Sequence, residues 1–234
     1  MEILVLGSGG VSSVSSYPGY LVDRTVLVDC PPGTTKKFIW EGIDPCSITD
    51  VVITHFHADH YFDLPFLFLA RYKKTEDTLR VHCPEEGLDI IPRILELAYP
   101  DIPLISIPFE LDHSGAFRCG GYSFTRFEVV HGCKGQSYAD LVEGDGARAG
   151  FSGDSSYCPA LEEIAGNCEC FICECTRLTG SEKHMGVDTL LKLKAGHPSC
   201  RIYATHMTDG ARSRLQELGI SGIEALNDSQ LIRI

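Results

Sequence analysis

Long apolar segments are missing from this sequence of 234 residues. Its apolar runs stay well below the roughly 18 residues that a membrane-spanning helix needs. Residues 1–7 hold no basic stretch ahead of an apolar one, and they are typical of a strand entering a glycine turn rather than of a signal peptide. We therefore expect no membrane segment, and a cytoplasmic location in which the 11 cysteines stay reduced.

Basic residues are also scarce. The 20 Lys and Arg residues stand against 32 Asp and Glu, which gives a formal net charge of −12 at pH 7. General nucleic-acid binders depend on Lys and Arg to neutralise phosphates, so this balance argues against that class. The short basic stretches at 36–37 and 71–74 are better explained as solvated helix ends than as a binding rim.

No linker divides the sequence, which has no Ser/Gly tract, charge block or Pro-rich run. Its 44% hydrophobic content suffices for one good-sized core. We therefore predict a single domain over residues 1–234. Short β-rich runs alternate with helical patterns, which is typical of an α/β fold.

The expected elements follow from hydrophobic periodicity and turn residues. Strands are expected at 2–6, 25–29, 51–54, 138–142, 148–152, 170–174 and 201–204. Residues 103–130 are expected to be mostly strand-like, first at 104–107 and then at 122–130. Helices are expected from 35, across 85–98, near 159–165, and at 188–195 and 209–218. Asp23-Arg24 is predicted to form a hairpin turn, and Asp63 to cap a helix that has Pro65 in its first turn.

The most informative segment is Thr54-His55-Phe56-His57-Ala58-Asp59-His60, directly after an apolar strand. It supplies three imidazoles and a carboxylate on a loop that can turn them toward one point. Such a set suits Zn²⁺ or a similar borderline ion. Burying these groups together would be costly without a cation, so the segment indicates a metal site rather than an exposed polar loop.

Three more candidate ligands each stand where an expected strand ends: His131, Asp154 and His206. A lone histidine after a strand is usually an ordinary surface residue. Several at successive strand ends, together with an aspartate, are harder to explain in that way. Functional groups of layered α/β folds collect on the loops at one edge of the sheets, so we expect these residues to meet.

The order His-x-His-x-Asp-His, then His, Asp and His, resembles the metallo-β-lactamase superfamily over nearly the whole chain. The resemblance implies a four-layer αββα sandwich, a homodimer, and two divalent metal ions, with Zn²⁺ expected first and Mn²⁺ as an alternative. It assigns three ligands to the first ion, three to the second and one bridge: His55, His57 and His131; Asp59, His60 and His206; and Asp154. Two ions can share a water and lower its pKa toward 7, so a bridging hydroxide would be the nucleophile, oriented by Asp59.

Further segments resemble the tRNase Z-like phosphodiesterases: 29–35, 48–54 and 63–65. In addition, Glu174-Cys175-Thr176 leads to His184, which lies 22 positions before His206. Members of this branch, including cyclic phosphodiesterases of phosphonate breakdown, place a non-ligand histidine at a similar distance. The resemblance therefore implies a general-acid role for His184 and a phosphodiester substrate. The alternative for His184 is an ordinary surface histidine ahead of a helix.

Other features argue against tRNA processing itself. Full tRNase Z enzymes carry a long tRNA-gripping arm between the ligands that match His131 and Asp154, whereas two expected strands already occupy that short interval here. The segment Thr205–Asp209 also departs from the usual His-x-Ser-x-Arg ending, and the cysteine-rich zinc site of the phosphonate enzymes is missing near the N-terminus. We predict a small or cyclic phosphodiester, and we do not expect structured tRNA as the partner.

Four different functions stay open: an acyl-bond hydrolase of lactonase or thioesterase type, a tRNA 3′-end endonuclease, an iron-dependent sulfur dioxygenase, and a non-catalytic metal-holding domain. Cysteines at 168–175 are predicted to line a buried strand as small apolar residues rather than to form a further metal site. Cys133 could approach the metals, but we assign it no role.

Overall fold

Two β-sheets face each other in the computed structural model, which describes the backbone of residues 1–234 and every side chain except that of Ile105. The first sheet contains β1 (Glu2–Gly7), β2 (Gly19–Val22), β3 (Val26–Val28), β4 (Asp50–Val52), β5 (Leu79–His82), β6 (Phe109–Asp112) and β14 (Leu231–Arg233), paired in the order β14-β1-β2-β3-β4-β5-β6. The second contains β7 (Ala116–Cys119), β8 (Tyr122–Glu128), β9 (Tyr138–Gly144), β10 (Ala147–Phe151), β11 (Cys170–Glu174), β12 (Arg201–Thr205) and β13 (Ile223–Ala225), paired in the order β13-β12-β11-β10-β9-β8-β7.

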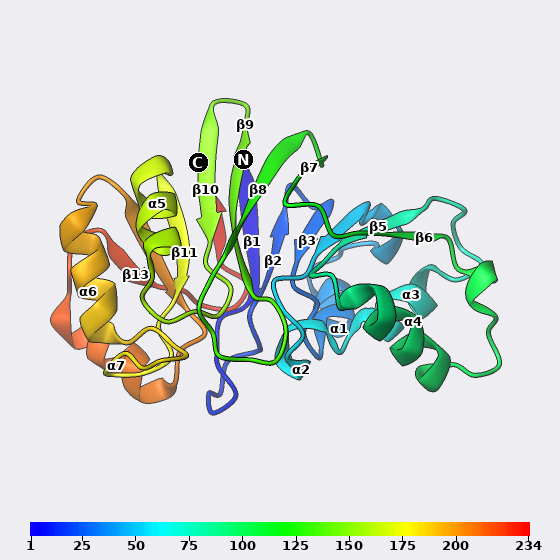
Figure 1. Cartoon of the computed structure of the whole chain (residues 1–234), viewed down its shortest axis with the longest axis horizontal. Coiled ribbons are helices and arrows are strands. Elements are labelled where there is room, and N and C mark those ends of the chain that lie inside the picture. The colour runs from blue at the N-terminus through cyan, green and yellow to red at the C-terminus, as the bar shows by residue number, and fades with distance from the viewer.

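Helices cover the outer face of each sheet (Figure 1). The first sheet carries α1 (Thr34–Trp40), α3 (Leu64–Arg71) and α4 (Gly87–Ala98), and the second carries α5 (Pro159–Asn167), α6 (Val187–Gly196) and α7 (Asp209–Leu218). The predicted four-layer αββα sandwich is therefore confirmed. Short helices lie in the connections: α2 (Ala58–Tyr61), and the 3₁₀ turns η1 (Pro45–Ser47) and η2 (Leu104–Ser106). Within the described residues, no helix is long and apolar enough to cross a membrane.

Strand β1 shows why the sheets are buried on both faces. Ile3 and Val5 belong to the core between the two sheets, whereas Leu4 and Leu6 belong to the core under the helices of the first sheet. Successive side chains of a strand point to opposite faces, so a strand covered on both sides is apolar at nearly every position. A third core lies between the second sheet and α5, α6 and α7.

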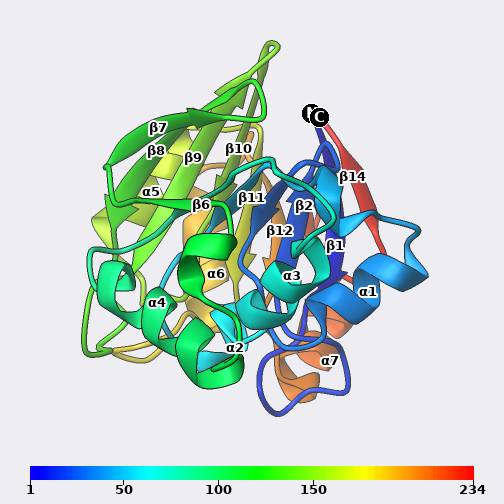
Figure 2. The same cartoon turned by 90° about the vertical axis from the view of Figure 1, so that its right-hand side faces the viewer.

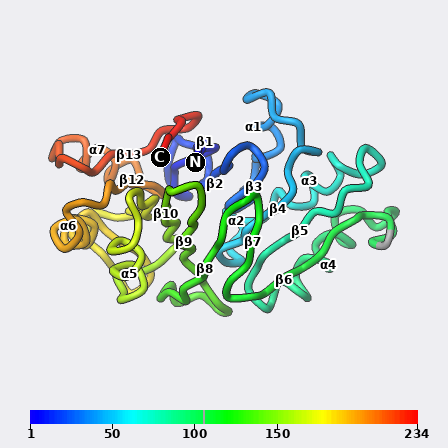
Figure 3. The backbone as a smooth tube through the Cα atoms, turned by 90° about the horizontal axis from the view of Figure 1, so that it is seen from above, coloured from blue at the N-terminus to red at the C-terminus, as the bar shows by residue number. Residues whose placement is uncertain are grey.

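The two termini lie side by side (Figures 2 and 3). Strand β14 pairs antiparallel with β1, and the amino group of Met1 donates to the carbonyl oxygen of Ile234 over 3.1 Å. The end of the chain thus completes the sheet that its beginning starts.

Parallel pairing sends the carboxyl ends of several strands to one edge of the sandwich. Strands β3 and β4 are parallel, as are β10, β11 and β12. The connection after β4 leads into α2, at the lower edge of the sandwich in Figure 1. The loops after β4, β10 and β12 carry candidate ligands, so this edge is where they can meet.

Most expected elements are confirmed, including the hairpin turn, where Asp23 and Arg24 both adopt positive φ. The expectation of strand at 104–107 is wrong for most of that run, because Leu104–Ser106 forms a 3₁₀ turn directly after Pro103. The side chain of Ile105 lies outside the description. A short apolar run cannot by itself distinguish strand from helical turn. The short strands β2, β5, β13 and β14 were not among the expected ones.

Asp63 caps a different helix from the one predicted. It stands at the N-cap position of α3, but its side chain makes no cap hydrogen bond there. Its carboxylate instead accepts from the backbone N–H of Thr35 over 2.6 Å and of Gly33 over 3.2 Å, at the start of α1. The unpaired N–H groups of α1 lie beside Asp63, and a carboxylate between two helix starts can serve either one.

The cysteine-rich segment packs as predicted. Cys170 faces the core between the sheets with Ile172, whereas Cys173 and Cys175 face the core under α5 and α6. All three thiols are buried on or directly after β11. They therefore serve as small apolar residues in the two cores.

A polar cluster lies among the buried residues at the β4–β5 pair. Arg80 donates to both oxygens of the buried Asp50 carboxylate, over 2.7 and 3.0 Å. His82 lies between two carboxylates, with Nε2 3.2 Å from Asp50 and Nδ1 2.9 Å from Asp112. Burial raises the pKa of Asp50, but hydrogen bonds from His82 and Arg80 outweigh it and lower that pKa to about 2.

We expect Asp50→Asn to cost about 2 kcal/mol of unfolding free energy at pH 7, because a carboxyl with a depressed folded-state pKa stabilises the fold once it is ionised. This stabilisation is fully present above the unfolded-state pKa and is lost as pH falls through about 2. The difference between variant and wild type should therefore shrink below pH 4. Urea unfolding at pH 7, 4 and 3 measures it, with Asp89→Asn, at an exposed pair with Arg93, as the control. A difference that stays constant with pH would contradict this account.

Candidate metal centre

The segment after β4 brings four candidate ligands to one place. His55 and His57 lie on the loop, and Asp59 and His60 lie on the single turn of α2. Sequence analysis predicted a loop throughout, whereas the last two ligands are on a helix. Consecutive helical positions differ by about 100° in direction, so Asp59 and His60 approach the cluster from different angles.

The remaining three candidates also stand after strands, as predicted. His131 follows β8, Asp154 follows β10 and His206 directly follows β12. His206 has a positive φ of 53°, a conformation that non-glycine residues rarely adopt. Such strain persists where the surroundings fix the residue, and it aims this imidazole back at the cluster.

One group of ligand atoms combines His55, His57, His131 and Asp154, all within 4.8 Å of one another. Nε2 of His131 lies 3.0 Å from Nδ1 of His57 and 3.8 Å from Oδ2 of Asp154. Nε2 of His55 lies 3.9 Å from the same carboxylate oxygen. These separations are close to those between neighbouring ligands of one tetrahedral ion.

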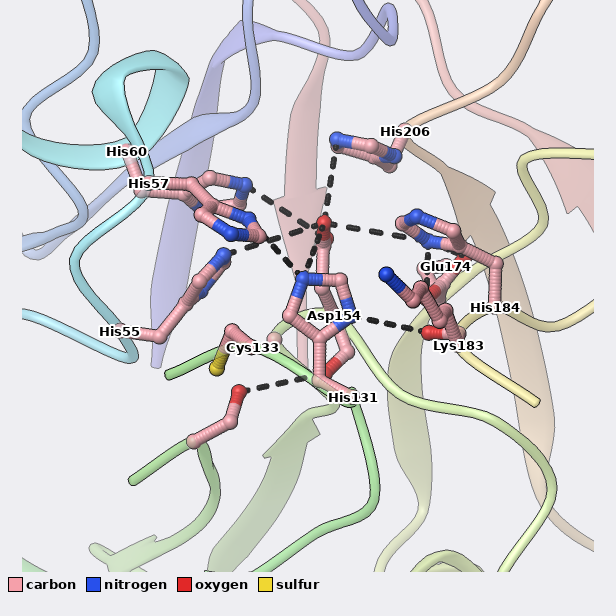
Figure 4. A network of polar contacts seen from close by, with 12 residues as sticks. His55, His57, His60, His131, Cys133, Asp154, Glu174, Lys183, His184 and His206 are labelled. Carbon is pink, nitrogen blue, oxygen red and sulfur yellow. Dashed lines mark hydrogen bonds and ion pairs between the residues drawn. The ribbon is translucent and has the colours of Figure 1, made fainter. Parts of the chain in front are cut away.

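A second group combines Asp59, His60 and His206. Nε2 of His206 lies 3.4 Å from Oδ2 of Asp59 and 3.4 Å from Oδ2 of Asp154. Nε2 of His60 lies 3.5 Å from Oδ1 of Asp154. Asp154 is therefore central to both groups, as Figure 4 shows. The structure brings all seven predicted ligands together.

The donor atoms of this site suit a cation. The Nε2 atoms of His55 and His60 are buried and have no hydrogen-bond partner among the described residues. Burial and the neighbouring His60 lower the pKa of His55, which keeps its imidazole neutral with a lone pair to offer. Burial opposes ionisation of Asp154, but His206 and His60 hold the pKa of its carboxyl well below the usual range. Imidazole nitrogens around an ionised carboxylate are the donor set of a divalent metal site.

The outward nitrogen of each of three imidazoles is held by a neighbouring group. Nδ1 of His60 lies 2.7 Å from Oδ2 of Asp29, and Nδ1 of His206 lies 2.8 Å from Oγ1 of Thr176. Nδ1 of His131 donates to the carbonyl oxygen of Lys183 over 2.9 Å. Partners of this kind fix the orientation of a ligating histidine and leave its inner nitrogen for the ion.

Asp29 has a positioning role that sequence analysis missed. Besides His60, its carboxylate accepts from the backbone N–H of Thr54 over 2.9 Å and from the hydroxyl of Thr54. It thus connects the start of the ligand-bearing segment to α2. The available signal was an aspartate directly after the apolar strand β3, with a φ of 57° that Asp and Asn tolerate best among non-glycine residues.

His184 lies beside the cluster, as predicted, with a carboxylate partner that was not. Its Nδ1 is 3.0 Å from Oε1 of the buried Glu174 and 3.9 Å from Oδ2 of Asp154. Glu174 also accepts from the hydroxyl of Thr176 and from the backbone N–H of Ser155. Burial and Asp154 raise the pKa of Glu174 well above its ordinary value, and burial lowers the pKa of His184. The contact with Glu174 orients the imidazole and leaves its Nε2 for the adjoining cavity.

That cavity, of about 640 Å³, opens beside the cluster. The metal-ligand candidates His57, Asp59, Asp154 and His206 form one part of its wall, and His184 joins them. The rest of the wall is Val11, Ser12, Thr176, Arg177, Leu178, Thr179 and Thr208. A volume of this size is typical of a small-molecule site. Cys133 lies near His131 in Figure 4, but it is outside the ligand groups of the described residues.

The family model of the β-lactamase superfamily domain matches residues 24–207. This range covers most of the chain and all of the ligand candidates, so the chain belongs to this superfamily. The superfamily that the sequence predicted is thereby confirmed.

Curated relatives point to one branch of that superfamily. The chain is 28% identical over 144 residues to Ribonuclease Z of Pyrococcus abyssi, which is 59% of this chain and 47% of the relative. It is 30% identical over 149 residues to Ribonuclease Z of Metallosphaera sedula, covering 61% and 48% respectively. The chain spans about half the length of the curated relatives it matches. The resemblance to the tRNase Z-like branch is confirmed.

Solved structures share the fold. The metallo-β-lactamase fold protein YhfI of Bacillus subtilis has a TM-score of 0.80 at 18% identity, covering 99% of this chain and 98% of that one. A diphosphatase from the PhnP family has a TM-score of 0.79 at 20% identity, covering 100% and 97%. The short form of human tRNase Z has a TM-score of 0.78 at 18% identity, covering 100% and 99%.

We expect Asp29→Asn to weaken divalent metal binding about 10- to 100-fold, because His60 loses the carboxylate that orients it. Asn tolerates the left-handed backbone of this position, so the variant should fold. Competition with a chelating dye measures the affinity. Asp145→Asn, at an exposed left-handed turn position, is the matched control. Equal affinities for Asp29→Asn and its control would show that Asp29 does not position the ligand.

Proposed function

We propose that this member of the superfamily is a dinuclear metal-dependent phosphodiesterase that acts on a small or cyclic phosphodiester, and that residues 1–234 form one hydrolase domain. The observation that carries the proposal is the position of His184. Its Nδ1 contacts Glu174 and faces the shared carboxylate of Asp154, so its ring stands beside both ligand groups. A departing thiolate does not require an acid at this place, whereas a departing alkoxide does.

In this proposal the two ligand groups hold one divalent ion each. The assignment follows the two clusters: His55, His57 and His131 for the first ion, Asp59, His60 and His206 for the second, and Asp154 for both. When bound, such ions polarise the phosphoryl oxygens and lower the pKa of a water held between them. The second group also supplies Asp59, whose carboxylate lies on the cavity wall and can orient that water.

His184 has the role of general acid. As an imidazolium, its ring donates from Nδ1 to Glu174 and holds a second proton on Nε2, which it can give to a leaving oxygen and so become neutral. Glu174 fixes the tautomer and direction of the ring, in the same way that buried carboxylates orient catalytic imidazoles elsewhere. Hydrogen bonds from Thr176 and Ser155 fix the Glu174 carboxylate, and the carboxylate in turn fixes the His184 ring.

Cleavage of tRNA 3′ ends is the second candidate, because the curated relatives are named Ribonuclease Z. Against it stands the interval between His131 and Asp154, where the β9–β10 hairpin pairs tightly into the second sheet. No protruding arm emerges from the described residues of this interval. The net charge of −12 also opposes binding of a large polyanion. A small substrate accords better with a cavity of about 640 Å³.

Acyl hydrolysis and iron-dependent oxidation make different demands on the site. A thioesterase would leave His184 without a task at the leaving group, and a lactonase would turn over a lactone rather than a phosphodiester. A sulfur dioxygenase would hold iron and depend on oxygen. The homodimer remains a prediction from the resemblance.

We expect His184→Ala to lower kcat about 100- to 10,000-fold on a 2′,3′-cyclic nucleotide, whose alkoxide leaving group needs a proton. The loss should be much smaller on bis(p-nitrophenyl) phosphate, because p-nitrophenolate leaves unprotonated. Steady-state kinetics on both substrates measures the contrast. Glu174→Gln should show the same contrast in weaker form.

The matched control is His197→Ala. His197 also contacts a glutamate, Glu162, but it lies outside the cluster. Its removal should leave both rates unchanged. Equal activity of His184→Ala on the cyclic nucleotide would contradict the general-acid role.

We expect about two divalent ions, zinc or manganese, per wild-type chain by elemental analysis. His131→Ala should reduce this to about one, because it removes a ligand from the first group alone, and Asp154→Ala should impair both positions. Chelation should abolish turnover of bis(p-nitrophenyl) phosphate. A content of one iron ion per chain, with no hydrolysis, would contradict the phosphodiesterase proposal and favour a sulfur dioxygenase.

A further inference from the structure

Arg177 holds a fixed place on the wall of the cavity. It follows Thr176 on the segment that leaves β11, and this segment returns at Gly186. The backbone N–H of Arg177 donates to the carbonyl oxygen of Met185 over 3.4 Å, and its carbonyl oxygen accepts from Val187 over 2.9 Å. These contacts close the loop that carries His184. They fix the backbone of Arg177 at the base of this loop.

Thr176 is half-buried at the inner part of the cavity wall, and Arg177 is exposed at its outer part. The hydroxyl of Thr176 contacts Glu174 and His206, and so faces the cluster. Successive residues of an extended backbone point in opposite directions, and Arg177 makes a β-bridge with Gly186. Its side chain is exposed at the outer part of the cavity.

The guanidinium of Arg177 has no hydrogen-bond or ion-pair partner within the described part of the chain. Every remaining arginine does have one. Exposed Arg93, Arg148, Arg214 and Arg233 each contact a carboxylate, and the rest contact carboxylates, carbonyl oxygens or hydroxyls: Arg24, Arg71, Arg80, Arg118, Arg126, Arg201 and Arg212. In a chain of net charge −12, an unpaired arginine is unusual. It is also the only Lys or Arg among the residues described as lining this cavity.

Two exposed apolar residues line the same cavity. Leu178 is 56% exposed and Val11 is 69% exposed, and both line the cavity. An exposed guanidinium in a cavity that also has apolar lining matches a ligand with an organic body and an anionic end. The planar fork of arginine binds phosphate and carboxylate oxygens in pairs.

We propose that Arg177 binds a second oxyanion of the substrate, so that the preferred phosphodiester carries a further anionic group beyond the bond that is cleaved. The inference rests on the proposed phosphodiesterase function. It assigns the inner part of the cavity to the reacting diester and the outer part to this group, for which a phosphate monoester is the test case.

Two chromogenic substrates differ in that group alone: the p-nitrophenyl ester of thymidine 5′-phosphate, and the same ester carrying a 3′-phosphate. The metal-loaded wild type should favour the second substrate through a lower KM. In Arg177→Gln the ratio of kcat/KM for the two substrates should fall about tenfold, mainly in KM, because only one of them offers the second oxyanion. Arg177→Lys should retain part of the preference, since it keeps the charge but not the fork.

Arg148→Gln is the matched control, because Arg148 is also exposed but lies on β10 against Glu169. It should leave the substrate ratio unchanged. Calorimetric binding of thymidine 3′,5′-bisphosphate, compared with thymidine 5′-phosphate, gives a readout that does not need turnover. Arg177→Gln should weaken the bisphosphate selectively.

These experiments distinguish failure of the proposed role of Arg177 from failure of the proposed phosphodiesterase function. Hydrolysis of both esters with no wild-type preference for the 3′-phosphate overturns the role of Arg177 and leaves the phosphodiesterase intact. An equal loss on both esters in Arg177→Gln also overturns it, because Arg177 would then act on the reacting diester. If neither ester is hydrolysed, the phosphodiesterase proposal fails, and the calorimetry still decides whether Arg177 binds a second oxyanion.

Discussion

The carboxylate of Asp154 is the contact on which the site depends. Five imidazole nitrogens lie within 3.9 Å of its oxygens, from His55, His60, His131, His184 and His206. A buried carboxylate is stable only with compensating charge, and buried imidazoles need either protons or a cation. Because one aspartate serves residues from four separate segments, each segment has to end at the same depth in the sandwich. The two-sheet fold meets this condition by sending the carboxyl ends of β4, β10 and β12 to one edge.

Positioning around Asp154 comes from a surrounding ring of polar groups. Asp29 holds His60, Thr176 holds His206, and Glu174 holds His184. Thr176 also donates to Glu174, so the orientation of a metal-ligand candidate and of the proposed acid depends on one hydroxyl. Geometry of this kind couples the two functions: displacement of β11 would move both rings together. The same strand continues into Arg177, which extends the arrangement to the outer cavity.

The sequence predicted which residues meet at this site, because each segment that carries them follows an apolar run that is visible without a structure. It predicted most strands and helices for the same reason. It missed the roles of Asp29 and Glu174, because a positioning carboxylate has no spacing rule and its partner is distant in sequence. The cap at Asp63 was placed on the wrong helix, because the start of α1 reaches it only through the tertiary fold. The 3₁₀ turn at Leu104–Ser106 was predicted as strand, since apolar content alone does not fix the backbone. The unpaired state of Arg177 could be seen only after the rest of the arginines had been matched with partners.

An acidic protein that acts on an anionic substrate presents an electrostatic difficulty, since a net charge of −12 repels phosphates at a distance. Salt screens that field over roughly 8–10 Å, so local charges decide binding within the cavity. The Asp59 and Asp154 carboxylates on the wall are offset by the proposed metal ions, and Arg177 adds a positive charge at the outer part. A small substrate can be enclosed by these local charges. A long polyanion would extend beyond them over the acidic surface, and this difference in reach is the physical reason to favour a small phosphodiester.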